Sequence, residues 1–220
     1  MQIKVIITGS TGMVGEGVLL ACLANPNVAE VLIINRKHLD RNDPKLKELL
    51  LPDFSRLDEF KEQLRGYDAC FYCAGISSVG VTEDDFTKAT YGITVPFAET
   101  LSGINPNMVF NYVSGRRTDG TEQGKVMWAR VKGKTENALM NLPFKAQYNF
   151  RPGFMKPIKG QKNINTIYKV FAALYPLWIT FLPNWTCTMQ EVGQAMINSV
   201  LKGYPEQIIE VADIKKLAKL

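Results

Sequence analysis

A buried strand, a tight turn and the first turn of a helix are encoded one after another in Val5-Ile6-Ile7-Thr8-Gly9-Ser10-Thr11-Gly12-Met13-Val14-Gly15. Three glycines in this stretch, Gly9, Gly12 and Gly15, have the spacing G-x-x-G-x-x-G. Glycine lets the backbone turn sharply and lets a pyrophosphate approach closely, because no Cβ is in the way. The free N–H groups of the following helix would face the phosphates. The stretch therefore predicts a dinucleotide site; the alternative is a strand-to-helix turn that binds no nucleotide.

Size and charge narrow the class of protein. The chain has 220 residues and a formal charge of +5, so we expect a single NAD(P)-binding domain over residues 1–220. The lysines and arginines form no dense block, so we expect an anionic cofactor and no nucleic-acid partner. Met1-Gln2-Ile3-Lys4 leads straight into the first strand with no signal peptide, so we expect a cytoplasmic protein.

Four cysteines and one histidine bear on metal and redox chemistry. The cysteines stand in apolar surroundings and are expected to be reduced core residues; they are Cys22, Cys70, Cys73 and Cys187. Cys70 and Cys73 form a C-x-x-C pair, a pattern that also occurs in redox and metal sites. They lie in the strand-like run 69–74, where residues three apart point to opposite faces. We therefore expect no metal site. The single histidine, His38, is expected in a loop near the cofactor.

Strand and helix patterns alternate along most of the chain, which predicts an α/β fold with a doubly wound, mostly parallel sheet and helices on both faces. A small helical lid is expected near the C-terminus. The expected strands are 3–8, 31–34, 49–53, 69–73, 109–113, 148–150 and 207–211, and the expected helices include 13–23, 57–64, 83–101 and 125–140.

The end of the second expected strand predicts which dinucleotide binds. In such folds an acidic residue there accepts a hydrogen bond from the ribose of NAD, whereas a basic residue accommodates the 2′-phosphate of NADP. This chain has Asn35, Arg36 and Lys37, with no acid before Asp40. We therefore expect NADP, with NADPH preferred over NADH; the alternative is that both cations are solvated loop charges. Further cofactor contacts are expected from Asp53 and Phe54 near the adenine and from Ala74 and Gly75 after the fourth strand.

The character of the chain changes after Gly153. Three lysines, Lys156, Lys159 and Lys162, precede the apolar stretch 167–185. That stretch approaches the length of a membrane span, but Lys169 and two prolines interrupt it. We therefore expect residues 154–188 to form a substrate lid or a homodimer surface, with membrane contact as the less favoured alternative. The three lysines together with the apolar residues of this segment favour a partly apolar, anionic ligand.

Taken together, these motifs resemble the short-chain dehydrogenase/reductase superfamily in its extended or atypical branch. Within it the chain is similar to the small Tat-interacting oxidoreductase-like group and to NAD-dependent epimerase/dehydratase-like proteins. The matching residues are the 8–15 loop, 35–37, Ala74, Gly75, Ser114, Lys132 and the Arg151-Pro152-Gly153 turn. The resemblance implies that Lys132 binds the nicotinamide ribose and that Ser114 holds the substrate oxygen. It also implies cofactor contacts from Pro152 and Gly153.

One position departs from the family pattern. The superfamily uses a Tyr-x-x-x-Lys pair on one helix face, but Trp128 stands four residues before Lys132 and no Tyr occurs between Tyr112 and Tyr148. An indole cannot exchange a proton near neutral pH. The sequence therefore leaves two functions open. One is an NADP-dependent oxidoreductase or epimerase-like enzyme for an unknown small carbonyl or hydroxyl substrate. The other is a catalytically inactive NADP(H)-binding sensor or scaffold.

Overall fold

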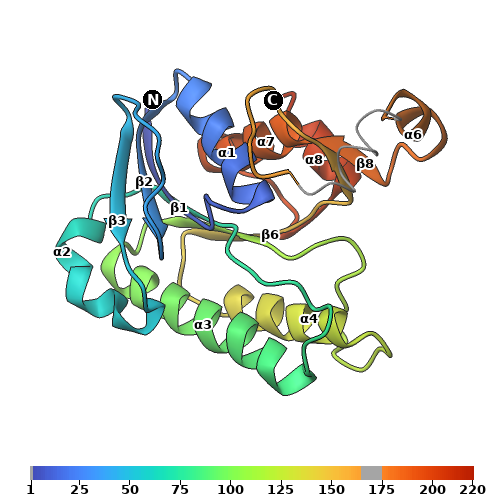
Figure 1. The fold of residues 1–220 in the computed structure, drawn as a ribbon, viewed down its shortest axis with the longest axis horizontal. Coiled ribbons are helices and arrows are strands. Elements are labelled where there is room, and N and C mark those ends of the chain that lie inside the picture. Colours follow the sequence, from blue (N-terminus) through green and yellow to red (C-terminus); the bar gives the residue numbers. More distant parts are fainter. Residues whose placement is uncertain (1, 165–174) are drawn as a thin grey trace.

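A seven-stranded, fully parallel sheet forms the centre of the protein in a computed structural model that describes residues 2–164 and 175–220 (Figure 1). Its strands lie in the order β3-β2-β1-β4-β5-β6-β9. Their bounds are β1 Ile3–Thr8, β2 Val28–Asn35, β3 Leu46–Leu50, β4 Ala69–Tyr72, β5 Val109–Val113, β6 Ala146–Arg151 and β9 Ile208–Glu210. The expected doubly wound sheet is confirmed.

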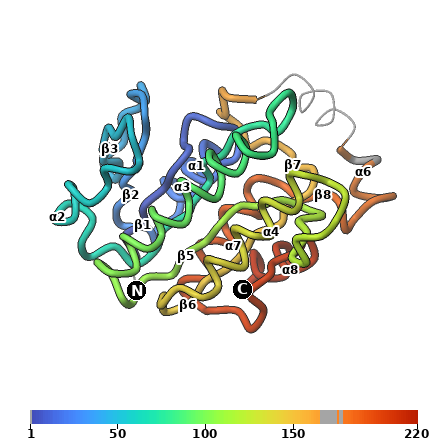
Figure 2. The backbone as a smooth tube through the Cα atoms, turned by 90° about the horizontal axis from the view of Figure 1, so that it is seen from below, coloured from blue at the N-terminus to red at the C-terminus, as the bar shows by residue number. Residues whose placement is uncertain are grey.

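Helices cover both faces of the sheet. Figure 1 shows α1, α7 and α8 on one face and α3 and α4 on the other, and α3 and α4 lie side by side (Figure 2). The bounds are α1 Met13–Ala24, α2 Lys61–Leu64, α3 Glu83–Ile104, α4 Met127–Met140, α6 Tyr175–Phe181, α7 Met189–Leu201 and α8 Val211–Leu217, with a 3₁₀ helix, η1, at Phe54–Phe60. Each face of the sheet therefore buries its own apolar cluster.

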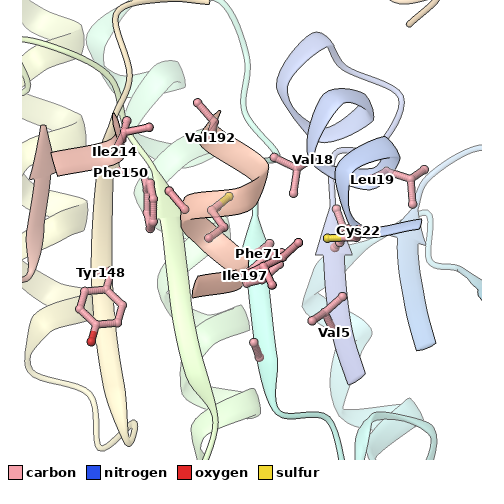
Figure 3. Packing of buried hydrophobic residues seen from close by; sticks show 14 of the residues in the cluster. Val5, Val18, Leu19, Cys22, Phe71, Tyr148, Phe150, Val192, Ile197 and Ile214 are labelled. Atoms are coloured by element: carbon pink, nitrogen blue, oxygen red, sulfur yellow. The ribbon is translucent and has the colours of Figure 1, made fainter. Parts of the chain in front are cut away.

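The cluster under α1 and α7 shows what stabilises the fold (Figure 3). Val18 of α1 and Val192 of α7 pack over Phe71 of the sheet, and all three are fully buried. Burying one such side chain contributes about 1.5–3 kcal/mol. Two glycines allow the close approach of the helices: a Cβ on Gly193 of α7 would lie 2.3 Å from Cβ of Ala21, and one on Gly17 of α1 would lie 2.4 Å from Met189.

The cysteines occupy the two cores as predicted. Cys22 and Cys73 belong to the cluster under α1, whereas Cys70 belongs to the cluster on the opposite face, and all four cysteines are free. Burial raises the pKa of the Cys73 thiol to about 12, so it is an inert thiol near neutral pH. In the described ranges, no three His, Cys, Asp or Glu side chains gather closely enough to hold a metal ion.

Two expected elements differ from the structure. The third strand runs Leu46–Leu50 rather than 49–53, because Leu46 pairs with Val31 and the ladder ends before Pro52, which has no N–H to donate. The helix expected at 57–64 is instead the end of the 3₁₀ helix η1, in which Arg56 has a non-helical conformation, followed by the single turn α2. Neither difference changes the order of the sheet.

The two ends of segment 154–188 lie side by side. Its first strand, β7 Phe154–Lys156, pairs in parallel with β8 Thr186–Thr188, which returns the chain to the main body. The apolar stretch predicted at 167–185 lies partly outside the described residues. None of the helices in the described part of the chain has the length and apolar character needed to span a membrane. The assignment of this segment as a lid or interface stays a prediction.

Candidate functional site

The three glycines of the first turn lie at the point where the winding of the sheet reverses. The chain adds β2 and β3 on one side of β1 and then crosses to β4 on the other side. At such a point the connections that leave neighbouring strands run to opposite faces of the sheet, and ligands bind in the crevice between them at the carboxyl ends of the strands. The loop after β1 and the residues after β4 therefore border one crevice.

Backbone packing in this loop requires glycine at two positions. Gly9 has φ +69°, and a Cβ there would lie 2.7 Å from the backbone of Ala74. A Cβ on Gly15 would lie only 2.1 Å from the carbonyl oxygen of Gly9. The backbones of the turn, of the start of α1 and of the residues after β4 thus lie in close contact. We call this arrangement the cradle, and it has no room for a side chain at Gly9 or Gly15.

The start of α1 is suited to an anion. Its N-cap is Gly12, which has no side chain to accept from the first N–H groups of the helix, so these donors are available to phosphates. Glu16 is the one acid in the first turn, and it is buried. Its carboxylate accepts hydrogen bonds from the backbone N–H groups of Lys162 at 2.8 Å and Asn163 at 2.6 Å. The residues present therefore fit a dinucleotide at the helix start.

A groove of about 550 Å³ extends from the loop along the ends of the strands and continues into a smaller cavity of about 220 Å³. Ten predicted cofactor contacts line them: Gly9, Thr11, Gly12, Asn35, Arg36, Lys37, Asp53, Phe54, Ala74 and Gly75. Four other predicted contacts are not among the residues that line these two cavities, namely Ser10, Met13, Val14 and Gly15. Ser10 ties the loop to β2, because its hydroxyl donates to Oδ1 of Asn35 at 2.9 Å.

The predicted cations Arg36 and Lys37 reach this groove without a carboxylate partner among the described residues. An acid of the neighbouring strand β3, Glu48, lies beside the end of β2 and accepts a hydrogen bond from the side chain of Asn35 at 3.4 Å. Glu48 accepts hydrogen bonds from the Leu39 N–H at 2.9 Å and interacts with His38 at 2.5 Å. Partial burial works to raise the pKa of Glu48, but its hydrogen bonds with His38 and Leu39 outweigh burial and lower that pKa overall. The carboxylate of Glu48 is thus ionised and already engaged.

A second cavity of about 480 Å³ opens beside the first groove, and Ile76 lines both it and the smaller cavity. It brings together the remaining predicted site residues: Ser114, Trp128, Lys132, Pro152 and Gly153. Trp128 therefore faces this cavity. Lys132 donates a hydrogen bond from Nζ to the backbone carbonyl of Ser114.

A buried acid that sequence reasoning missed holds the side chain of Ser114. The hydroxyl of Ser114 donates to Oε1 of Glu136 at 2.5 Å, and Glu136 has no exposed surface. Arg151 donates to both carboxylate oxygens of Glu136, at 3.0 and 2.5 Å. The available signal was spacing, because Trp128, Lys132 and Glu136 recur every four residues on α4 and so share a helix face.

Burial also acts on Lys132. Burial lowers the pKa of its ammonium to about 8, although the negative charge of Glu136 works in the opposite direction. Tyr148 and Tyr91, two tyrosines that could in principle exchange a proton in place of Trp128, lie elsewhere. Tyr148 exchanges hydrogen bonds with the backbone of Tyr204, and the ring of Tyr91 packs against Lys134. Neither lines the cavity.

Comparisons with known proteins show what this chain is similar to. A model of the NAD dependent epimerase/dehydratase family matches residues 5–132. The chain is 27% identical to Protein HTATIP2 of Rattus norvegicus over 91% of this chain and 83% of that protein. It is 24% identical to Protein fmp52, mitochondrial, of Emericella nidulans over 90% and 88% of the two chains. The PhqB reductase domain of Penicillium fellutanum has the same fold, with a TM-score of 0.69, 17% identity, and coverage of 96% of this chain and 67% of that one.

Proposed function

Because the chain belongs to the NAD-dependent epimerase/dehydratase family, we propose that it is an NADP(H)-dependent oxidoreductase or epimerase-like enzyme for a small carbonyl or hydroxyl compound. One observation carries the proposal: the groove at Gly9 continues into the smaller cavity, and that cavity shares Ile76 with the cavity at Lys132. A dinucleotide on the glycine loop would extend toward the second cavity, where a substrate would lie beside Lys132.

The preference for NADP(H) is supported by charge. Arg36 lines both the groove and the adjoining cavity, and Lys37 lines the groove. A guanidinium can hold a phosphate with two parallel hydrogen bonds. Glu48, which could otherwise accept from a ribose hydroxyl, is occupied by His38 and the backbone of Leu39. These contacts favour a 2′-phosphate at this corner.

When bound, the nicotinamide supplies or accepts a hydride. The proton at the substrate oxygen must come from the protein or from water, and Lys132 is the group we assign to it. Its ammonium has three N–H donors, of which one is used by the carbonyl of Ser114. A pKa of about 8 lets the amine both give and take a proton near neutral pH.

Ser114 has a different part in this scheme. Its hydrogen is directed to Glu136, so the hydroxyl would meet a ligand as an acceptor rather than a donor. Arg151 keeps Glu136 in place through two hydrogen bonds. Ser114 would therefore orient a substrate hydroxyl, while Lys132 exchanges the proton.

The experiment compares Lys132→Met with Lys134→Met, a control on the exposed side of the same helix. Both variants and the parent are assayed for NADPH oxidation with a panel of small aldehydes and ketones. We expect Lys132→Met to lose at least about tenfold in kcat and Lys134→Met to match the parent. Turnover by the parent that survives unchanged in Lys132→Met would remove Lys132 from the proposed role.

A second function is supported by Trp128. Because no described tyrosine lines the cavity and an indole exchanges no proton near neutral pH, an NADP(H)-binding sensor or scaffold without turnover is the alternative. Tight NADPH binding together with no oxidation of NADPH across the panel would select the sensor. Binding with turnover would select the enzyme.

The location of the protein in the cell and its oligomeric state are the subject of two separate proposals. We propose a cytoplasmic protein in which segment 154–188 acts as a lid or a dimer surface; Phe181, which is 76% exposed, and Ile179 supply apolar surface for either role. The relative from Emericella nidulans carries the word mitochondrial in its name, so fractionation of cells that express the tagged chain is the test. Light scattering tests dimer formation, and flotation with liposomes tests membrane contact.

A further inference from the structure

The loop after β5 is bound through its backbone to β6 and the turn that follows β6. The Ser114 N–H donates to the Phe150 carbonyl at 3.0 Å, and the Arg116 N–H donates to the Pro152 carbonyl at 3.0 Å. Gly115 has φ +135°, a conformation that side chains rarely adopt. Its carbonyl accepts from both the N–H and the hydroxyl of Thr118. The loop is thus a fixed platform for the two residues that follow Gly115.

Those two residues are arginines that face an aromatic ring. The guanidinium carbon of Arg116 lies 4.0 Å from the ring centre of Trp185, and that of Arg117 lies 5.1 Å from it. Arg117 has φ +69°, a left-handed conformation that is uncommon outside glycine. Such conformations persist where surrounding structure over-determines them, and they concentrate at functional sites.

Neither guanidinium has a carboxylate partner within residues 2–164 and 175–220. Arg116 donates from one terminal nitrogen to the Asn184 carbonyl at 3.2 Å, and its Nε is buried without an acceptor. A guanidinium has five N–H donors, so most of those on Arg116 are unused by the described chain. Stacking on Trp185 orients both groups without neutralising them.

Both arginines line the cavity that contains Lys132. The lining therefore holds three cationic side chains, and none of its lining residues is acidic. Two acids near this lining are engaged by Arg151: Glu136 is bound by Arg151 and Ser114. Glu210, which lines an adjoining cavity together with both arginines, lies 3.4 Å from Arg151. Like charges confined in one cavity repel each other, so an anion is the ligand that this lining favours.

We infer that the cavity at Lys132 takes an anionic substrate, a carboxylate or phosphate ester, whose charged group is held by Arg116 and Arg117. Its apolar part would contact Trp128 and Phe86, which line the same cavity. This inference rests on the proposed function, because it names the class of substrate for the same site. It is carried by the loop after β5 and not by the lysines of the later segment.

The test uses matched probes on the protein saturated with NADP⁺. Phenylacetate and phenyl phosphate are each titrated against the neutral analogue 2-phenylacetamide, with calorimetry and tryptophan fluorescence as readouts. We expect the better anion to bind at least about tenfold more tightly than the amide, and the ranking of the two anions identifies carboxylate or phosphate. Equal affinity of anions and amide, or no saturable anion binding up to about 10 mM, would overturn the inference.

Two variants locate the binding. Arg117→Asn keeps a residue that tolerates the left-handed backbone, and Arg116→Gln removes the other charge. We expect each to bring the anion and the amide to within about twofold of each other, while the affinity for NADP⁺ stays as in the parent. The control is Arg65→Gln. Arg65 is exposed, follows directly after α2 and forms an ion pair with Glu62 of that helix. An anion preference that persists in both cavity variants would also overturn the assignment.

The titration with NADP⁺ alone separates the two proposals. If NADP⁺ does not bind, the proposed function fails, and the anion titrations are repeated on the protein without cofactor. If NADP⁺ binds and the probes do not discriminate by charge, the proposed function stands and the inference fails.

Discussion

The hydroxyl of Ser114 donates a 2.5 Å hydrogen bond to Oε1 of Glu136, a carboxylate with no exposed surface. The same carboxylate receives two hydrogen bonds from Arg151. A serine on a strand end, an acid on a helix and an arginine on the next strand are therefore coupled beneath the cavity at Lys132. This coupling places the serine oxygen with its hydrogen turned away from the cavity.

Glu136→Gln should destabilise the protein strongly. Removing one partner of a buried ion pair leaves the other charge uncompensated, which costs about 3–5 kcal/mol. Because Glu210 also lies 3.4 Å from Arg151, we expect a loss at the lower end of that range in urea unfolding. The matched control is Glu62→Gln, an exposed partner of Arg65, which should change the free energy of unfolding by less than about 1 kcal/mol. Equal effects of the two variants would contradict the coupling.

Gly15→Ala should disrupt the cofactor site. The added Cβ would meet the carbonyl oxygen of Gly9 at 2.1 Å, so the loop must move away from the start of α1. We expect the affinity for NADPH to fall by at least about tenfold, together with a lower melting temperature. Gly103→Ala, in α3 with nothing beyond the neighbouring backbone of its own helix within 4 Å of the new Cβ, should leave binding unchanged and add up to about 1 kcal/mol of stability. Unchanged NADPH binding by Gly15→Ala would count against the cradle.

Arg36→Gln should weaken the binding of NADPH and leave the binding of NADH nearly unchanged. If Arg36 binds the 2′-phosphate, its loss weakens NADPH binding by about tenfold or more and changes NADH binding by less than about twofold. Arg41→Gln is the control, since Arg41 belongs to the same loop and is not among the residues lining the groove. Calorimetric titration of both dinucleotides gives the answer. Equal affinity of the parent for NADPH and NADH would refute the preference.

The pH dependence of stability should report on Lys132. Its pKa is about 8 in the folded protein, below the usual 10.5, so the unfolded chain binds more protons between these values. The contribution of Lys132 to stability therefore rises with pH from about 8 to about 10.5. Lys132→Met should remove that increment from urea unfolding curves recorded at pH 7.5 to 10.5, spanning about that window, whereas Lys134→Met should retain it. Parallel profiles for the parent and Lys132→Met would contradict the lowered pKa.

Trp128→Tyr should raise carbonyl reduction or leave it unchanged. Residue 128 lines the same cavity as Lys132 and stands four residues before it, so a tyrosine there gains a hydroxyl that can exchange a proton. Steady-state rates with the aldehyde and ketone panel test this. A fall of tenfold or more, about 1.4 kcal/mol in the barrier, would show that Trp128 has a catalytic role of its own.

The amino-acid sequence by itself determined the sheet and the glycine loop. Apolar runs such as Ile3–Thr8 and Val109–Val113 specify buried strands through local composition, and the glycine spacing specifies a turn through what a Cβ would obstruct. Local patterns predicted strand boundaries less well where pairing with a neighbouring strand sets them. At β3 the register with β2 places the strand at Leu46–Leu50 rather than at the predicted 49–53.

Only the tertiary structure decided which residues join the predicted ones at the second cavity. Glu136, Arg151 and Ser114 come from α4, β6 and the loop after β5, and Trp185 comes from a segment that returns through β8. No local pattern connects residues so far apart in sequence, because their contacts depend on sheet order and helix packing. The same packing buries Lys132 and thereby lowers its pKa. Spacing marked Trp128 and Lys132 as neighbours, but the folded chain placed two arginines beside them and engaged the nearby acids elsewhere.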